Sequence, residues 1–344
     1  MFALGRSYAW GMIAGTMTRA PESVAELMPP ELAAQLDRLD VVSRKLFAGK
    51  LQGERRSKRR GRSVEFDDYR EYVAGDDLRH IDWNVFARLD RFFIKVFQEE
   101  EDLAVHLVID ASASMNAGEP NKLLVAARLA MALGYIGLVN NNRVLATVFG
   151  AGPLRRMDPQ RGRRGTQRLG AFLLEHVFAG VSMGGEENTP AGPTFGAALR
   201  TIAATPTGKG VTVVVSDLLV PGGYEDGLRA LGAAAVAGAM DVLCLQVLSP
   251  GELDPGAEGK TAGDAEREAA VVGDLRLTDV ETGRAAEVTV TKELVAQYRR
   301  SVQKYIADAA AFCSARGMQH ELVRSDDDPG KLLTGELRRI GLLR

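Results

Sequence analysis

One stretch of the chain, LAVHLVIDASASM at residues 103–115, constrains the fold more than any other. It starts as an almost continuous apolar run and ends abruptly at Asp110. A short run of this kind predicts a strand that is buried on both faces, as in a parallel sheet. Asp110 would then lie at the carboxyl end of the strand, which is the edge of an open α/β sheet where ligands bind. The stretch therefore predicts both a fold class and the position of a site.

Strand-like apolar runs and segments with helical periodicity alternate along the rest of the chain. The runs typical of strands lie at 103–110, 143–149, 211–215, 241–247 and 319–324. Helices are expected at 121–140, 167–178, 196–203, 224–238, 292–316 and 330–340. Strands that alternate with helices are typical of parallel sheets, so the expected class is α/β with a doubly wound, mostly parallel sheet.

Changes in composition along the chain suggest three parts. Residues 1–53 are expected to form an N-terminal helical segment with partly disordered ends, and the spacing over 22–50 favours a helical hairpin or one long amphipathic helix ending near Gly49 or Gly53. Residues 54–102 form a charged segment that we expect to pack on the sheet domain, with a strand at 92–97 entering the sheet. The sheet domain spans 103–344 and contains an insertion at 250–290 with the pattern of a β-hairpin.

The composition and the two cysteines bear on the partner class and on the cellular compartment. The chain has 344 residues, of which 46% are hydrophobic, and a net charge of −2, which gives no general argument for nucleic-acid binding. Its two cysteines, Cys244 and Cys313, lack metal-ligand spacing, so we expect free core thiols in a reducing cytoplasm. We expect neither a signal peptide nor a transmembrane segment.

Two local runs are strongly basic, at Arg55–Arg62 and at Arg155–Arg168. Such runs attract phosphate, nucleic acid or an acidic protein. No aromatic side chains are interleaved as stacking platforms, and no zinc-finger or basic-zipper pattern accompanies them. We therefore expect solvated loops or a protein contact, and keep nucleic-acid binding as an alternative.

Short oxygen donors gather in loops at or beside the carboxyl edge of the predicted sheet. They are Asp110, Ser112 and Ser114 in a tight Asp-x-Ser-x-Ser loop, Thr194 (or Thr189) before a short helix, and Asp217 after a strand. Carboxylate and hydroxyl oxygens suit a hard cation, and Mg²⁺ keeps several waters, so a few such groups suffice. Asp and Ser also cap ordinary turns, which is the alternative interpretation of the first loop taken alone.

The full set of motifs resembles two known patterns. Asp-x-Ser-x-Ser after a buried strand, then a Thr and a strand-terminal Asp, resembles the metal-ion-dependent adhesion site of von Willebrand factor A domains. The upstream stretch GRSVEFDDYREYVAGDDLRHIDWNVFAR followed by VIDASASM resembles, more specifically, the bacterial family catalogued as domain of unknown function fifty-eight. The resemblance covers residues 45–325, including an Asp-x-Glu-Thr-Gly turn at Asp279–Gly283.

The resemblance implies a von Willebrand factor A-like, Rossmann-type sheet domain with a metal site. Matched residue by residue, the metal ligands would be Asp110, Ser112, Ser114, Thr194 and Asp217, with the hydroxyls in direct contact and the aspartates acting directly or through water. The open coordination position would take a carboxylate from a partner protein. The resemblance also implies a partner, a MoxR-type AAA+ ATPase, and a chaperone-like role in protein assembly or maturation. One residue departs from the pattern, because Phe195 stands where family members often have Asp.

The function that we expect is a non-enzymatic, Mg²⁺-dependent protein-binding adaptor. The sequence contains no phosphate loop, no His-Glu-x-x-His and no Gly-x-Ser-x-Gly elbow, and His106 lies inside the buried strand, where we expect a core residue rather than a base. One alternative is a Mg²⁺-dependent phosphohydrolase with Asp110 as nucleophile. Such enzymes usually carry a second Asp two residues on, where this chain has Ser112. The other alternative is nucleic-acid binding through the basic loops.

Overall fold

The computed structural model describes residues 19–43, 66–73, 78, 81–97, 103–182, 192–205, 207–237, 240–255, 273–278 and 285–344. The chain divides into two compact units, one of Met1–Leu46 with Leu103–Arg344 and one of Phe47–Asp102. The basic run at 55–62, the alternative ligand Thr189 and the expected turn at 279–283 lie outside the described residues. Packing of the charged segment on the sheet domain stays a prediction.

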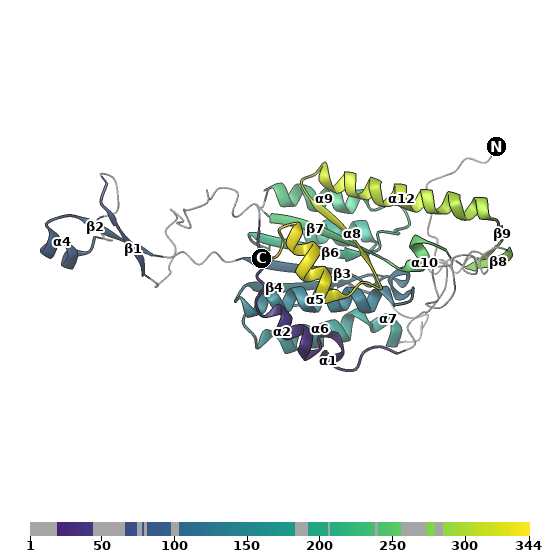
Figure 1. Cartoon of the computed structure of the whole chain (residues 1–344), viewed down its shortest axis with the longest axis horizontal. Coiled ribbons are helices and arrows are strands. Elements are labelled where there is room, and N and C mark those ends of the chain that lie inside the picture. The colour runs from purple at the N-terminus through teal and green to yellow at the C-terminus, as the bar shows by residue number, and fades with distance from the viewer. Residues whose placement is uncertain are drawn as a thin grey trace. The chain divides into compact units, whose positions relative to one another are not determined.

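A six-stranded sheet forms the centre of the first unit (Figure 1). The strand order is β10-β7-β6-β3-β4-β5, and all neighbours are parallel except β4 and β5. The strands are β3 (Ala104–Asp110), β4 (Arg143–Phe149), β5 (Arg155–Arg156), β6 (Gly210–Ser216), β7 (Met240–Leu248) and β10 (Gln319–Arg324). The expected α/β class and mostly parallel sheet are confirmed. The short β5 was not expected, because it lies in a basic run that we interpreted as a loop.

Side chains of the central strands alternate between two hydrophobic cores. On β3, Leu107 and Ile109 face the core that contains α5 and α6, whereas Val108 faces the core formed with α8, α9 and α12. Figure 1 shows α5 and α6 on one side of the sheet and α9 and α12 on the other. Burial on both faces explains why the strand sequences are nearly continuous apolar runs. The helices are α5 (Lys122–Val139), α6 (Gly165–Val177), α7 (Ala179–Ser182), α8 (Phe195–Ala203), α9 (Glu225–Ala237) and α12 (Lys292–Ser314).

Helix α5 packs directly on the sheet and is apolar around most of its circumference, apart from Lys122 and Arg128. Its N-cap, Asn121, accepts hydrogen bonds from the backbone N–H groups of Leu123 and Leu124 at 3.0 and 3.3 Å, and such caps contribute about 1 kcal/mol. By length and composition α5 could cross a membrane, and 83% of it is buried inside the protein. The expected absence of a transmembrane segment stays a prediction. A helix that is covered on nearly all sides needs apolar residues on nearly all sides.

The N-terminal residues of the first unit form two short helices, α1 (Val24–Leu27) and α2 (Pro30–Leu36). Pro30 is the first residue of α2, where its missing N–H has no intrahelical partner to lose. The expected long helix is wrong, because α2 ends at Leu36 and Val41 forms an isolated β-bridge with Leu343. Leu27 and Leu36 are fully buried in the core that contains α5. These residues therefore belong to the sheet unit.

The second unit contains a two-stranded antiparallel sheet of β1 (Phe66–Glu71) and β2 (Phe93–Phe97), with helix α4 (Trp83–Leu89) between the strands in sequence. Asp82 caps α4 by accepting from the backbone N–H of Asn84 at 2.9 Å, and it also accepts from the Tyr69 hydroxyl at 2.9 Å. The strand expected at 92–97 is present. Its expected place in the main sheet is wrong, because it pairs with β1. An alternating apolar pattern predicts a strand but does not identify its partner.

The remaining elements are a β-hairpin and several short helices. Strands β8 (Gly273–Thr278) and β9 (Ala285–Val290) pair antiparallel, which confirms a hairpin within the expected insertion. Helix α10 (Pro250–Leu253) follows β7 directly, and the short helix η2 (Ala113–Asn116) follows β3. The chain closes with consecutive helical turns, α13 (Pro329–Lys331), η3 (Leu332–Glu336) and α14 (Leu337–Arg339), within the range expected for a helix.

Candidate metal site

Asp110 is the centre of the candidate site. It is the last residue of β3, and its side chain is only 2% exposed because β4 and β6 flank the strand on both sides. One carboxylate oxygen, Oδ1, accepts from the backbone N–H of Ser112 at 3.0 Å. The other, Oδ2, accepts from the hydroxyl of Ser216 at 2.7 Å. Ser216 is the last residue of β6, so two neighbouring strand ends meet at this carboxylate.

The electrostatic environment of Asp110 is unfavourable for a negative charge. Burial and, to a smaller extent, the nearby charge of Asp217 raise its pKa to about 6, because the hydrogen bonds from Ser216 and Ser112 offset only part of these two effects. Within the part of the chain that the structure describes, no cationic side chain forms an ion pair with Asp110. A buried carboxylate without a counter-ion is costly, and a bound cation would remove the cost.

The loop after β3 places two hydroxyls beside this carboxylate. Ser112 precedes η2 and Ser114 lies within it, and their Oγ atoms are 3.1 Å apart. Gly150, which follows β4, lies so close that an added Cβ would be 2.5 Å from the Ser112 nitrogen and 3.0 Å from Asp110 Oδ1. Its φ of +100° is also a conformation that favours glycine. The tight Asp-x-Ser-x-Ser loop therefore depends on a glycine from the next strand.

Thr194 lies at the start of α8, where it is the N-cap. Its hydroxyl oxygen accepts from the backbone N–H of Ala197 at 3.4 Å. The next residue, Phe195, packs its ring against that of Phe149 with centroids 5.8 Å apart. Phe149 precedes Gly150, so this contact holds the start of α8 near the loops of β3 and β4. Thr194 thus has a structural role as a cap, and its role as a ligand stays a prediction.

Asp217 follows β6 and is 1% exposed, but it already has charged and polar partners. Its Oδ2 accepts from Lys122 Nζ at 2.8 Å, and its Oδ1 accepts from the backbone N–H of Leu219 at 2.9 Å. Lys122 also donates to Glu252 Oε1 at 2.5 Å. The side chain of Lys122 has no exposed surface. Lys122, Asp217 and Glu252 therefore form a buried charged triad at the same end of the sheet as Asp110.

The two carboxylates keep Lys122 charged in spite of its burial. Desolvation pulls the pKa of Lys122 down, but the charges and hydrogen bonds of Asp217 and Glu252 outweigh it and raise the pKa above its usual value. Sequence reasoning missed Lys122, Glu252 and Ser216. The available signal was a lysine at the first position of an otherwise apolar helix, directly after the cap residue Asn121.

The donors around Asp110 fit a hard divalent cation. They are carboxylate and hydroxyl oxygens, which suit Mg²⁺ rather than metals that prefer imidazole or thiolate. Among the described residues, no group of three or more His, Cys, Asp and Glu side chains could hold a metal ion. A site here would therefore depend on hydroxyls and water, and the expected set of ligands stays a prediction.

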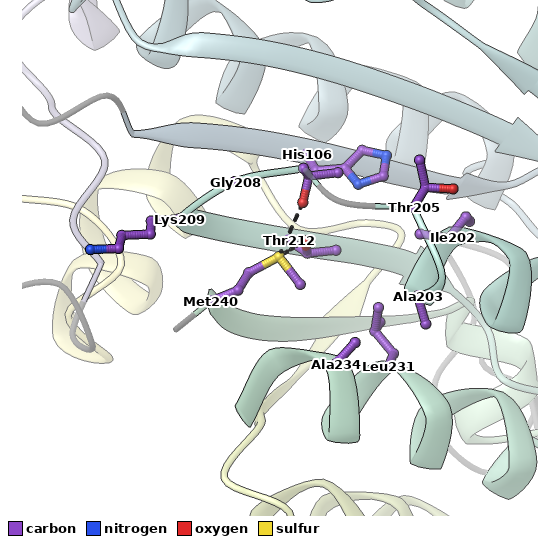
Figure 2. A pocket seen from close by; sticks show the side chains of 11 residues that line it. His106, Ile202, Ala203, Thr205, Gly208, Lys209, Thr212, Leu231, Ala234 and Met240 are labelled. Carbon is purple, nitrogen blue, oxygen red and sulfur yellow. Dashed lines mark hydrogen bonds between the residues drawn. The ribbon is translucent and has the colours of Figure 1, made fainter. Parts of the chain in front are cut away.

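A cavity of about 230 Å³ lies at the opposite end of the strands, away from these residues. Figure 2 shows His106, Thr212 and Met240 around this space, from the amino-terminal parts of β3, β6 and β7. The hydroxyls of Thr207 and Thr212 donate to the Met240 sulfur at 3.4 and 2.9 Å. The cavity therefore does not coincide with the candidate metal site.

His106 and the two cysteines have buried side chains. His106 Nε2 and Thr147 Oγ1 are hydrogen-bonded at 2.8 Å, and burial, with a smaller effect of the charge on Arg156, lowers the pKa of His106 to about 3. A neutral histidine in the core matches the expectation from the sequence. Cys244 and Cys313 are free and buried, also as expected.

Comparisons with other proteins identify a family. An uncharacterized protein of Mycobacterium bovis and an uncharacterized protein of Mycobacterium tuberculosis are each 26% identical to the chain over 303 residues, which is 87% of this chain and 86% of the relative. The family model described as "Protein of unknown function DUF58" matches residues 68–308, which is more than half of the chain. This range includes the β3 loop, α8, Asp217 and the charged triad. The chain therefore belongs to the bacterial DUF58 family of proteins of unknown function.

Proposed function

We propose that the protein is a non-enzymatic adaptor that binds a partner protein through a divalent cation held at Asp110. The observation that carries the proposal is the buried Asp110 carboxylate, which has no ion pair among the described residues and lies beside two hydroxyls. A cation would balance its charge and gain oxygen ligands at the same time. The proposed ligands are Ser112 and Ser114 with Asp110, joined by Thr194 and by Asp217 through water.

The cation would supply an electrophilic centre with an open position. Hydroxyls and waters donate little negative charge to a metal, so a Mg²⁺ ion held mostly by such ligands retains affinity for an additional carboxylate. An Asp or Glu side chain of the partner is the natural occupant. This arrangement is that of the metal-ion-dependent adhesion site in von Willebrand factor A-like domains, which we propose as the finer fold assignment.

The partner that we propose is a MoxR-type AAA+ ATPase, in the cytoplasm of a bacterium. Together the two proteins would assist the assembly or maturation of client proteins. The family resemblance supports this proposal. Because a bound cation would present a positive charge to the partner, the surface that it binds must carry an acidic side chain. We propose no nucleic-acid partner.

The test first measures metal binding and then measures capture of the partner. Isothermal titration calorimetry with Mg²⁺ on chelator-treated protein should detect binding to the wild type and loss of binding in Ser112→Ala. Ser301→Ala, at an exposed position of α12, is the matched control. Pull-down of the purified MoxR-type ATPase from the same organism should then succeed in Mg²⁺ and fail in EDTA. Equal capture by Ser112→Ala, or by the wild type in EDTA, would contradict the proposal.

A phosphohydrolase with Asp110 as nucleophile is less well supported. Both oxygens of Asp110 accept hydrogen bonds and the side chain is 2% exposed, which leaves little access for an attack on a phosphoryl group. A generic phosphatase substrate with Mg²⁺ tests this alternative. Turnover by the wild type that disappears in Asp110→Asn would favour the enzyme over the adaptor.

A further inference from the structure

The buried triad of Lys122, Asp217 and Glu252 has a consequence for how a metal would bind. We propose that Lys122 is a positioning residue that keeps Asp217 out of direct contact with the metal. The inference rests on the proposed function, because it concerns the same site. Lys122 bridges the two carboxylates at 2.8 Å from Asp217 and 2.5 Å from Glu252, and all three side chains are at least 94% buried.

Both oxygens of Asp217 already accept hydrogen bonds. Oδ2 binds the Lys122 ammonium, and Oδ1 binds the backbone N–H of Leu219 at 2.9 Å. A divalent cation that ligated Asp217 directly would have to share Oδ2 with the ammonium or Oδ1 with the Leu219 N–H. In either case the metal and the ammonium would lie close together on one carboxylate and repel each other. Contact through a water molecule avoids this conflict, because the water separates the two cations.

The backbone around Asp217 is held by two further hydrogen bonds. Gln246 donates from Nε2 to the Asp217 carbonyl at 3.1 Å, and Tyr305 donates from its hydroxyl to the Leu218 carbonyl at 2.6 Å. Leu218 itself has a φ of +60°, a strained conformation that the surrounding contacts must hold. The carboxylate is therefore fixed from its backbone as well as from its oxygens.

Glu252 is the second carboxylate bound to the Lys122 ammonium, and it is itself held in place. Its second oxygen, Oε2, accepts from the backbone N–H and the hydroxyl of Ser249 at 2.8 and 3.1 Å, in a capping box at the start of α10. Gly118, in the turn before α5, lies against Ser249, where an added Cβ would be 2.4 Å from the serine Cβ. This close approach places the first turn of α5 next to α10. Lys122, at the start of α5, can therefore reach Glu252 as well as Asp217.

The charges of the site also match a divalent cation. The buried cluster contains three carboxylates, those of Asp110, Asp217 and Glu252, and one ammonium, that of Lys122. A divalent cation would balance the excess of carboxylates. Because Lys122 already neutralises Asp217, the metal is left with few anionic ligands of its own, and the carboxylate of a partner completes its coordination.

The experiment measures the water bound to a metal rather than activity. Mn²⁺ replaces Mg²⁺ in oxygen sites, and the relaxation of water protons by bound Mn²⁺ increases with the number of its coordinated waters. The full-length wild type is compared with Lys122→Met/Glu252→Gln, which removes one positive and one negative charge and so frees Asp217 without changing the net charge. Mn²⁺ affinity is measured in parallel from the electron paramagnetic resonance signal of the free ion.

We expect the double variant to bind Mn²⁺ at least as tightly as the wild type but with lower relaxation per bound ion, corresponding to the loss of about one water. Asp217→Asn provides a second variant in case the first does not fold. Because Asp217 has no direct contact with the metal in this proposal, Asp217→Asn should leave the relaxation per bound ion unchanged.

Two results would overturn the inference while leaving the adaptor proposal intact. These are unchanged relaxation in the folded double variant, and higher relaxation in Asp217→Asn, which would mean that water has taken the place of a direct ligand. Absence of Mn²⁺ binding to the wild type would overturn the metal site and the role of Lys122 together. Binding that Ser112→Ala abolishes supports the site independently of Lys122.

Discussion

Replacing Asp110 by Asn should stabilise the metal-free protein, although Asp110 is the centre of the proposed site. In the folded chain, burial and the charge of Asp217 raise the pKa of Asp110 from 3.8 to about 6. The folded state therefore holds a proton on this carboxyl more tightly than the unfolded state does. Its contribution to stability falls as pH rises from about 4 to about 6 and stays at its lowest value above that range.

The size of the effect follows from the pKa difference. A shift of about two units corresponds to ~3 kcal/mol of unfolding free energy. In Asp110→Asn the side-chain carbonyl can still accept from the Ser112 N–H, and the amide can donate to the Ser216 hydroxyl, so the hydrogen bonds are largely kept. We expect the unfolding free energy of the variant to exceed that of the wild type by up to ~3 kcal/mol at pH 8 in EDTA.

Urea unfolding followed by far-ultraviolet circular dichroism measures this difference. Asp158→Asn, at an exposed position, controls for loss of a surface charge. The order of stability should reverse when Mg²⁺ is added at about 1,000 times its dissociation constant, because a ligand at that concentration stabilises the folded wild type by ~4.1 kcal/mol and should not bind the variant. If Asp110→Asn is less stable than the wild type at pH 8 in EDTA, the ionised carboxylate does not destabilise the metal-free protein, and the prediction is wrong.

Three further predictions concern the surroundings of the site. Gly150→Ala should abolish Mg²⁺ binding in calorimetry, because its Cβ would clash with the Asp-x-Ser-x-Ser loop. The control is Gly162→Ala, because Gly162 has a φ of +68° and no atom lies within 4 Å of its added Cβ. This control should lower the unfolding free energy by ~1–2 kcal/mol and keep Mg²⁺ binding. Tyr305→Phe removes a 2.6 Å hydrogen bond to the loop after β6 and should lower the unfolding free energy by ~1 kcal/mol; no loss in urea unfolding would contradict this. Cys244 and Cys313 are buried and should react with Ellman's reagent only in denaturant; rapid reaction of the folded chain would show that one is accessible.

The central sheet could be predicted from the sequence because its strands are buried on both faces. Each of the five long strands begins and ends within one residue of the expected range. A run such as VTVVV at 211–215 has few other ways to exclude its apolar side chains from water. The position of Asp110 at the sheet edge followed from the same pattern.

The charged triad could not be predicted, because its members are far apart in the chain. Lys122 lies 95 residues from Asp217 and 130 residues from Glu252. Lysine is almost never fully buried unless it is paired, so at the start of a helix it is interpreted as a surface residue. The partner of β2 was also missed, because its neighbour β1, with the sequence FDDYRE, is too polar to be recognised as a strand.

The arrangement of β3 has a consequence for the way the protein is made. Asp110 and Ser216, which close the strand ends, are 106 residues apart. At ~5–20 residues per second, a ribosome needs about 5–20 s to synthesise that interval. During this time β3 and the apolar α5 lack one covering neighbour, which is the state in which nascent chains bind chaperones or aggregate. The cluster of carboxylates, hydroxyls and lysine is complete only after residue 252 has been made, so its assembly coincides with the closing stages of folding.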